Sequence, residues 1–372
     1  MSNNRLVRFI KRPAGKPTPD IFEIDEEPLR ELGPGEFLAR NCYLSMDPAL
    51  VGRMRDESNY AGQVNPGDTM QAYGISQVIA SRNSKVKVGT VLLGLCGMQQ
   101  YIISDDSDGF SKINLGLADA TAYLSAVGIT GATAYFGLLD IGKPRAGETL
   151  LISAGASSVG SITAQIGKSL GLRTVAIVSS DDKAEQVKRD WGYDAAVSYR
   201  GKSIEQLSAD LAEACPHGVD IYYDNTSGDI SEAVLDHFND HARHVVIGRL
   251  GISHLNNTRD DTGRRDNNTI LAKRIRKQGM VLLDYKPKMR AAVLQLAKWL
   301  RQGDIQVQQD VLEGIDRCPE AFFRMLSGDS QGKQLVKLAD INPAADPTPL
   351  WPGRLLTQRW FPTDKLAQLL AR

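Results

Sequence analysis

Excess charge of either sign is absent from this chain of 372 residues, which carries 44 Lys and Arg against 44 Asp and Glu. Proteins that bind nucleic acid or an anionic membrane through general electrostatics depend on a surplus of basic residues. The balance therefore argues against nucleic acid and against a membrane surface as partners.

Cysteine and long apolar runs are scarce as well. The four cysteines, Cys42, Cys96, Cys215 and Cys318, are far apart and form no C-x-x-C pair. This excludes a dense disulfide framework and a four-cysteine zinc site. No apolar run reaches the roughly 18 residues that span a bilayer, and the N-terminal segment is polar where a signal peptide is apolar. We expect a cytoplasmic protein.

The chain divides into two parts with different sequence patterns. Residues 37–44, 74–80 and 91–94 read as short strands separated by Gly and Pro turns, which predicts a barrel or distorted sandwich. Apolar strands then alternate with helices, which predicts βαβ units and a parallel sheet. Strands are expected at 149–153, 174–178, 219–223 and 244–247, and helices at 161–170, 182–191, 230–238, 270–278 and 289–302.

A small-residue turn, GASSVG at 155–160, follows the expected strand 149–153 and precedes a helix. Such a turn lets the backbone approach a pyrophosphate, and the helix N-terminus offers N–H groups. Ser157 stands where the strict pattern has glycine, and its hydroxyl adds a donor. A tight turn without a ligand is the alternative, but the surrounding strand–helix alternation favours dinucleotide binding at Gly155, Ser157, Ser158, Val159 and Gly160.

The end of the next strand indicates which cofactor binds. An NAD site usually places an acid there for the ribose 2′-hydroxyl, whereas this strand ends in Ser179-Ser180 with Lys183 close behind. Hydroxyls and a lysine suit a 2′-phosphate. Ser180 followed by two aspartates is also typical of a helix N-cap, and both interpretations can hold. We predict NADP(H), with Ser179, Ser180 and Lys183 at the phosphate.

Several stretches together resemble a known family over about residues 5–339. The chain is most similar to the zinc-independent medium-chain dehydrogenase/reductases, in the branch of leukotriene B4 dehydrogenase/prostaglandin reductase, plant double-bond reductases and bacterial curcumin reductase. The matching stretches are 44–48 (LSMDP), 71–76 (QAYGIS), 131–139 (GATAYFGLL), 147–149 (GET), 223–225 (YDN), 283–285 (LDY) and 328–333 (GDSQGK).

The resemblance implies an α/β fold in two parts, with the cofactor in the cleft. A GroES-like β-barrel domain covers 1–125, a Rossmann NADP-binding domain with a doubly wound parallel sheet covers 126–285, and 286–340 returns to the first domain. Residues 341–372 are a C-terminal extension. The implied activity is metal-independent reduction of the C=C bond of α,β-unsaturated aldehydes and ketones with NADPH, in a homodimer.

The resemblance also supplies site residues. Lys183 and Tyr199 match the lysine and tyrosine that hold the 2′-phosphate, and Asn225, Gly248 and Ser330 are further cofactor-binding candidates. Ser330 replaces a family asparagine. The family's tyrosine and arginine after the Asp-Pro pair are also replaced, by residues of the run ALV at 49–51.

Hydride transfer to an enone builds negative charge on the carbonyl oxygen, which needs a hydrogen-bond donor, and the α-carbon needs a proton. Tyr73 and Tyr285 are the catalytic candidates by motif match, ahead of Tyr60 and Tyr135. The alternatives are that these tyrosines only pack, and that solvent supplies the proton.

No metal is predicted. The His-Glu position of zinc-dependent relatives falls at Gln71-Ala72, and all five histidines lie in the second half of the chain. His237 and His241 have helical i, i+4 spacing, which we interpret as a solvated helix end.

Two other functions remain open: a quinone or carbonyl reductase, and a cofactor-binding relative with little catalysis. The extension carries Trp351, Trp360 and Phe361 and a short amphipathic helix at 363–370. These aromatic side chains represent much apolar surface, so we expect the extension to be docked on its own subunit or a neighbour.

Overall fold

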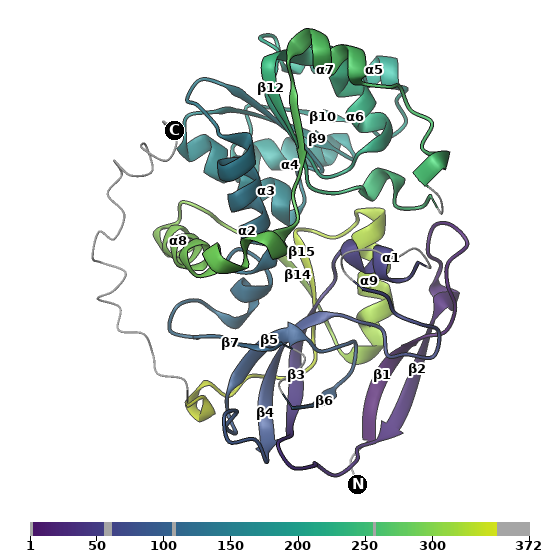
Figure 1. Cartoon of the computed structure of the whole chain (residues 1–372), viewed down its shortest axis with the longest axis vertical. Coiled ribbons are helices and arrows are strands. Elements are labelled where there is room, and N and C mark those ends of the chain that lie inside the picture. The colour runs from purple at the N-terminus through teal and green to yellow at the C-terminus, as the bar shows by residue number, and fades with distance from the viewer. Residues whose placement is uncertain (1–2, 56–61, 106–108, 256–257, 348–372) are drawn as a thin grey trace. The chain divides into compact units, whose positions relative to one another are not determined.

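The computed structural model describes residues 3–55, 62–105, 109–255 and 258–347 (Figure 1). Their contacts divide them into two compact units, one of residues up to 124 together with those from 308 on, and one of residues 125–307. The chain therefore returns to its first unit at Gln308, not near residue 286 as expected.

The second unit is built on a six-stranded parallel sheet in the order β10-β9-β8-β11-β12-β13. Numbered along the chain, this is the doubly wound order 3-2-1-4-5-6, which reverses between its first and fourth strands. The crevice at the carboxyl ends of β8 and β11 is therefore the expected dinucleotide position. The strands are β8 Thr149–Ser153, β9 Arg173–Val178, β10 Ala195–Ser198, β11 Val219–Asp224, β12 Phe238–Val246 and β13 Arg276–Gly279.

Helices cover both faces of this sheet. Every residue of β8 is buried, as expected for a parallel strand packed on both sides. Helices α2, α3 and α4 contact one another in sequence, α5 contacts α6, and Figure 1 shows the sheet between the two groups. The helices are α2 Ile129–Phe136, α3 Ser158–Ser169, α4 Asp181–Trp191, α5 Ile204–Ala214, α6 Gly228–Val234, α7 Asn267–Lys273 and α8 Met289–Gln302.

The helix expected at 270–278 is wrong in its second half. Helix α7 ends at Lys273, Arg274 has a left-handed φ of 50°, and β13 begins at Arg276. Residues 276–279 instead pair with Arg243–Val246 of β12. The helical spacing of apolar residues predicted a helix through this stretch. The residues instead form a strand because they pair with β12 at the edge of the sheet.

Helix α8 groups with the second unit although the expected boundary assigned it to the first. It packs against α2, and the rings of Trp299 and Tyr135 lie 5.9 Å apart. An amphipathic helix belongs to the unit whose surface buries its apolar face. A domain boundary drawn from sequence pattern does not show which unit that is.

The first unit contains a mostly antiparallel seven-stranded sheet in the order β14-β15-β3-β4-β5-β7, with β6 paired to β3, and the separate hairpin β1-β2. Strands β14 and β15 run parallel and are joined by α9, whereas the other strand pairs of this sheet within the described residues are antiparallel. Its strands are β1 Asn3–Phe9, β2 Phe22–Pro28, β3 Phe37–Ser45, β4 Tyr73–Ser81, β5 Val91–Leu95, β6 Tyr101–Ser104, β7 Ser111–Lys112, β14 Gln309–Glu313 and β15 Lys333–Lys337, and its α-helices are α1 Ala49–Arg53 and α9 Cys318–Ser327.

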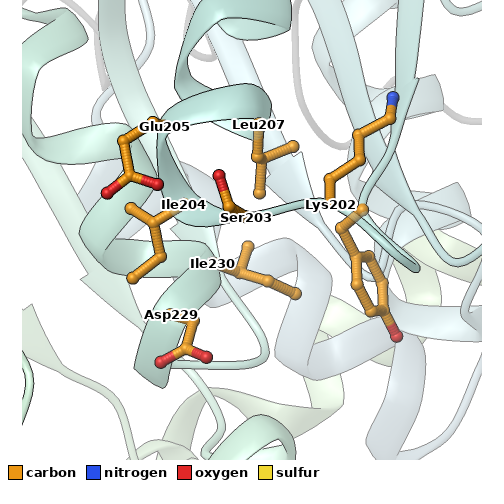
Figure 2. A pocket seen from close by; sticks show the side chains of 8 residues that line it. Lys202, Ser203, Ile204, Glu205, Leu207, Asp229 and Ile230 are labelled. Carbon is orange, nitrogen blue, oxygen red and sulfur yellow. The ribbon is translucent and has the colours of Figure 1, made fainter.

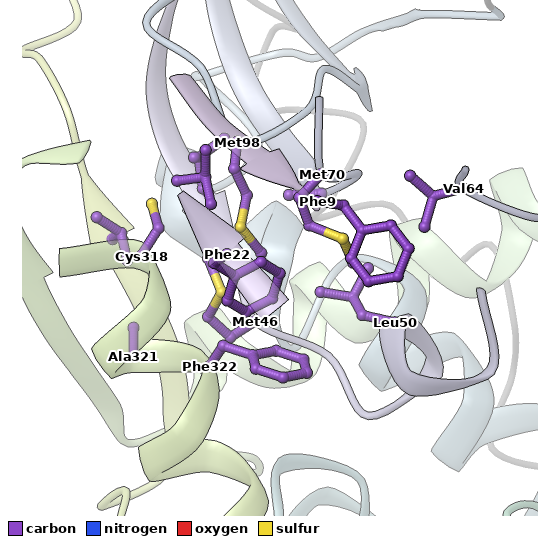
Figure 3. Close-up of a cluster of buried hydrophobic side chains, with 14 of the residues drawn as sticks. Phe9, Phe22, Met46, Leu50, Val64, Met70, Met98, Cys318, Ala321 and Phe322 are labelled. Atoms are coloured by element: carbon purple, nitrogen blue, oxygen red, sulfur yellow. The ribbon is translucent and has the colours of Figure 1, made fainter. Parts of the chain in front are cut away.

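The core of this unit explains why the chain returns to it. Helix α9 inserts Phe322 and Cys318 among side chains from the first hundred residues, including Phe9 and Phe22 (Figure 3). The rings of Phe22 and Phe322 meet edge to face at 5.4 Å, a favourable aromatic geometry. The N-terminal segment thus buries its apolar face only when residues from 308 onward complete it.

The start of the C-terminal extension is anchored on the first unit. Asn342 N donates to Gln77 Oε1 at 2.9 Å, and Gln77 Nε2 donates back to Asn342 O at 2.8 Å. Arg40 Nη2 donates to Asp340 O at 3.0 Å. A Cβ on Gly89 would lie 1.7 Å from Ala345 O, so this contact requires glycine. Trp351, Trp360, Phe361 and the expected helix at 363–370 lie outside the described residues, as does Tyr60.

Candidate functional site

The small-residue turn lies where β8 passes into α3, and its glycines are required by close packing. A Cβ on Gly155 would lie 2.6 Å from the Cβ of Ala176, and one on Gly160 would lie 2.5 Å from Ala154 O. Ala154 itself has a left-handed φ of 49°. Both positions therefore require glycine because the turn packs against β9 and against the start of α3, as in the glycine turn of a dinucleotide-binding fold.

Ser157 is the N-cap of α3. Its Oγ accepts from Gly160 N at 3.1 Å, so the serine that replaces a pattern glycine stabilises the helix start. Ser158 and Val159 are the first two helical residues, where backbone N–H groups have no partner within the helix. The positive end of α3 is thus directed at the carboxyl edge of the sheet, as anion binding requires.

The tips of β9 and β10 bring the 2′-phosphate candidates together. Ser179 and Ser180 follow β9, and Ser180 Oγ accepts from Lys183 N at 3.4 Å, so the N-cap interpretation holds. Tyr199 follows β10, and its N–H donates to Val178 O at 3.0 Å. Hydroxyls, a lysine and a tyrosine therefore share one corner of this unit with Asp181, whose carboxylate accepts a hydrogen bond from Ser198 Oγ at the end of β10.

A surface hollow of about 370 Å³ adjoins this corner and is lined in part by Tyr199. Figure 2 shows the apolar side chains of Ile204, Leu207 and Ile230 at its centre, with Lys202 to one side. An apolar floor beside a tyrosine can pack against a flat aromatic base.

Asn225 and Gly248 meet at the carboxyl ends of β11 and β12. Asn225 donates to Ser153 at the end of β8 twice, from its backbone N to Oγ at 2.9 Å and from Nδ2 to the carbonyl at 2.7 Å. A Cβ on Gly248 would lie 2.7 Å from Asn225 O. Asn225 therefore stands where the strand order reverses, and Gly248 lies against it.

A buried Asp224–His244 pair beneath these residues was missed by sequence reasoning. Asp224 Oδ2 lies 2.9 Å from His244 Nε2 and accepts from Ser231 Oγ at 2.7 Å, while Oδ1 accepts from Thr226 N at 3.0 Å and from Ser227 N at 2.8 Å. Burial works to raise the pKa of Asp224, but the bonds from His244, Ser227 and Ser231 outweigh it and lower the pKa. Sequence reasoning treated Asp224 only as part of the YDN motif, and nothing local to His244 indicates its partner.

Tyr285 follows the last strand of the parallel sheet, in the 3-10 helix Leu282–Lys288. Its ring stacks on Phe136 at 4.4 Å, and Lys288 Nζ lies 5.8 Å from the ring centre. Burial raises the pKa of Tyr285, and the Asp140 carboxylate raises it further. The phenol is therefore protonated at neutral pH and able to donate.

Tyr73 and Ser330 belong to the first unit. Tyr73 opens β4 and pairs with Ser45 of β3, and Ser330 lies in the loop before β15. Near them Lys333 forms an ion pair with Asp47, which also accepts from Ser45 Oγ at 2.6 Å. Lys333 thus joins two stretches on which the family resemblance rests, 44–48 and 328–333. This lysine is largely buried, and sequence reasoning had given it no role.

Within the described residues, no group of three or more His, Cys, Asp or Glu side chains is placed to hold a metal ion. The helical spacing of His237 and His241 does not place them on one helix. His237 ends the short helix Leu235–His237, whereas His241 lies in β12 with φ 62°. His237 Nε2 instead lies 2.9 Å from Ser208 Oγ.

No helix within the described residues is long and apolar enough to cross a membrane.

Comparison with known proteins agrees with this geometry. Residues 5–113 match the family described as the N-terminal domain of oxidoreductase, and residues 158–299 match the family described as zinc-binding dehydrogenase. The NADPH-dependent curcumin reductase of Escherichia coli is 33% identical over 90% of this chain and 97% of its own. Prostaglandin reductase 1 of Sus scrofa is 33% identical over 88% of this chain and 97% of its own.

A solved structure extends the match to the fold and the cofactor. CurA from Vibrio vulnificus in complex with NADPH is 31% identical and superposes with a TM-score of 0.83 over 90% of this chain and 99% of its own. These whole-length similarities confirm the expected fold class of a GroES-like domain with a Rossmann domain, and they confirm NADP(H) as the cofactor. The chain belongs to the zinc-independent medium-chain dehydrogenase/reductases, in the branch of the curcumin and prostaglandin reductases, and is an NADP-dependent oxidoreductase.

Proposed function

We propose that this enzyme reduces the C=C bond of α,β-unsaturated aldehydes and ketones without a metal ion. The observation that carries the proposal is the similarity, over nearly the whole chain, to proteins named for the reduction of curcumin and of prostaglandins. Curcumin is a conjugated enone, so the shared chemistry points to this substrate class.

We propose that residues 155–160 bind the pyrophosphate of NADP(H), and that Ser179, Ser180, Lys183 and Tyr199 bind its 2′-phosphate. The tight turn at the N-terminus of α3 supports the first assignment, and the shared corner of the tips of β9 and β10 supports the second. Serines follow Val178 directly, where an NAD site usually carries an acid, and together with the nearby Lys183 they favour a phosphate over a free ribose hydroxyl.

Asn225 and Gly248 complete the proposed cofactor site from β11 and β12, and Ser330 is proposed to contribute from the first unit. The close approach of Gly248 to Asn225 O supports a glycine requirement there, because a side chain would displace the asparagine. Bound NADPH supplies the hydride.

Tyr73 and Tyr285 are the proposed donors to the substrate. As hydride reaches the β-carbon, an enolate oxygen develops, and a phenol that stays protonated can donate a hydrogen bond to it. The raised pKa of Tyr285 means only that its phenol stays protonated at neutral pH, as this hydrogen bond requires. Replacing the donor by Phe should lower kcat with an enone and leave NADPH affinity unchanged, so a Phe variant with full kcat excludes that tyrosine.

The test is NADPH consumption with a panel of 2-alkenals, enones, quinones and the matching saturated ketones, followed by product analysis. NADPH carrying deuterium at nicotinamide C4 should place the label on the β-carbon of an enone, as read by NMR. Turnover of saturated ketones with the label on the carbonyl carbon would replace the proposal by carbonyl reduction, and turnover of quinones alone would replace it by quinone reduction.

A further inference from the structure

Tyr193 is a buried tyrosine that contacts the glycine turn. It follows Gly192, the C-cap of α4, and is only 4% exposed. Its hydroxyl donates toward Gly155 O and Gly160 O, each at 3.0 Å. A phenol has one proton, so the two carbonyls share it. A single side chain from outside the turn therefore holds its first and last residues.

The bond to Gly155 has a directional consequence. In a planar trans peptide the C=O and N–H groups point in opposite directions. With Gly155 O held toward the buried Tyr193 hydroxyl, the N–H of Ala156 points to the other side of the turn. The bond to Gly160 adds a second constraint, because that carbonyl belongs to the first turn of α3. The hydroxyl thus fixes the turn relative to the helix start.

The hydroxyl itself needs an explanation, since a buried O–H is unfavourable unless it is hydrogen-bonded. A phenylalanine ring would fill the same space without that cost. We propose that Tyr193 is a positioning residue for the cofactor, and that its hydroxyl holds residues 155–160 in the conformation that receives the pyrophosphate. This inference rests on the proposed assignment of that turn.

The direct test is Tyr193→Phe in the full-length protein, with NADPH binding followed by fluorescence. The dissociation constant for NADPH should rise about three- to tenfold, the range expected for one buried hydrogen bond. Adenosine 2′-monophosphate carries the 2′-phosphate but no pyrophosphate, so its affinity should not change. The kcat at saturating NADPH should be retained.

Tyr223→Phe is the matched control for a general loss of packing. Tyr223 is fully buried in the same unit, and its hydroxyl donates to Thr133 O at 2.8 Å, away from the turn. Both variants should lose similar thermal stability, but only Tyr193→Phe should weaken NADPH binding. Equal NADPH affinities in the two variants, or an equal loss of affinity for adenosine 2′-monophosphate in Tyr193→Phe, would overturn the inference.

Ser158→Asp separates this inference from the assignment of the turn. A carboxylate in the first turn of α3 favours the helix but repels a bound phosphate. If Ser158→Asp weakens NADPH binding and Tyr193→Phe does not, only the role of Tyr193 fails. If Ser158→Asp leaves NADPH binding unchanged, the turn is not the pyrophosphate site and both proposals fall.

Discussion

At the residue scale, Lys183 is the side chain on which cofactor choice most depends. It lies in the first turn of α4, directly behind the serines at the tip of β9. A charge-assisted contact to a phosphate is stronger than a neutral hydrogen bond to a hydroxyl. Discrimination between NADPH and NADH should therefore reside largely in this one ammonium group.

Lys183→Ala should reduce the preference for NADPH over NADH by about tenfold or more, since such contacts are worth roughly 1.5–3 kcal/mol. The loss should come through the KM for NADPH, with the KM for NADH unchanged, as measured by steady-state kinetics with both cofactors. Lys188→Ala is the control, because Lys188 belongs to the same helix and pairs with Glu185. An undiminished preference in Lys183→Ala would exclude Lys183 from the phosphate site.

At the element scale, the proposed cofactor site lies at the carboxyl ends of strands that are distant in sequence. Strand β11 is hydrogen-bonded to both β8 and β12, and its last residue, Asp224, binds His244 of β12 and the two residues that follow Asn225. Ser227 in this loop has φ 58°, an unfavourable conformation that persists only when its surroundings hold it. The buried carboxylate is thus a structural support of the loop.

Asp224→Asn should destabilise the protein at neutral pH by roughly 1.5–3 kcal/mol, because hydrogen bonds to a charged group are lost. The folded-state pKa of Asp224 is lowered below its ordinary value of 3.8. Its charge therefore contributes stability above about pH 4, and that contribution is lost as the pH falls further. The difference in unfolding free energy between the native protein and Asp224→Asn should accordingly shrink from pH 6 to pH 3, measured by urea titration.

Asp236→Asn is the matched control for this pH series. Asp236 pairs with Arg264 at 2.9 Å, and its side chain is 62% exposed. Exposed ion pairs contribute less than about 1 kcal/mol, so this variant should stay close to the native protein. A constant difference between the native protein and Asp224→Asn over the whole pH range would show that Asp224 titrates as an ordinary carboxyl.

At the scale of the whole molecule, residues from Gln308 onward complete the first unit. Strand β15 pairs with β3, α9 fills the core against β1 and β2, and the segment from Asp340 is bonded to Arg40 and Gln77. The C-terminal extension therefore begins as part of the fold.

A chain ending at Ala339 should unfold at a temperature several degrees below that of a chain ending at Pro347. The shorter chain removes Asn342 from Gln77, which is only 4% exposed, so Oε1 loses its donor while Nε2 keeps its bond to Gly89 O. An unsatisfied buried polar group costs about 1–3 kcal/mol, and each kcal/mol shifts the melting temperature by roughly 2–4 °C in a domain of this size. Equal melting temperatures would show that the anchored segment adds nothing.

The full-length chain should be more stable still, if Trp351, Trp360 and Phe361 are docked as their composition predicts. Comparison of the full chain with the chain ending at Pro347 tests this by melting temperature and by light scattering for oligomeric state. Identical results would show that residues 348–372 form a free appendage.

Local sequence patterns were sufficient to predict many of the strands and helices of the second unit. The apolar run at 149–153 and the helix at 289–302 have the expected bounds, and the small-residue turn lies between β8 and α3 as predicted. Amphipathic periodicity and glycine turns are properties of adjacent residues, so the sequence alone reveals them. The cofactor and family could likewise be predicted, because their motifs are short and contiguous.

Tertiary structure decided what depends on distant partners. Residues 276–279 became a strand because β12 was beside them, and α8 remained with the second unit because α2 covers its apolar face. The hydroxyl of Tyr193 and the ring of His244 acquire partners 38 and 20 positions away in sequence. Periodicity reports which face of an element is apolar, whereas only the folded chain determines which atoms that face meets.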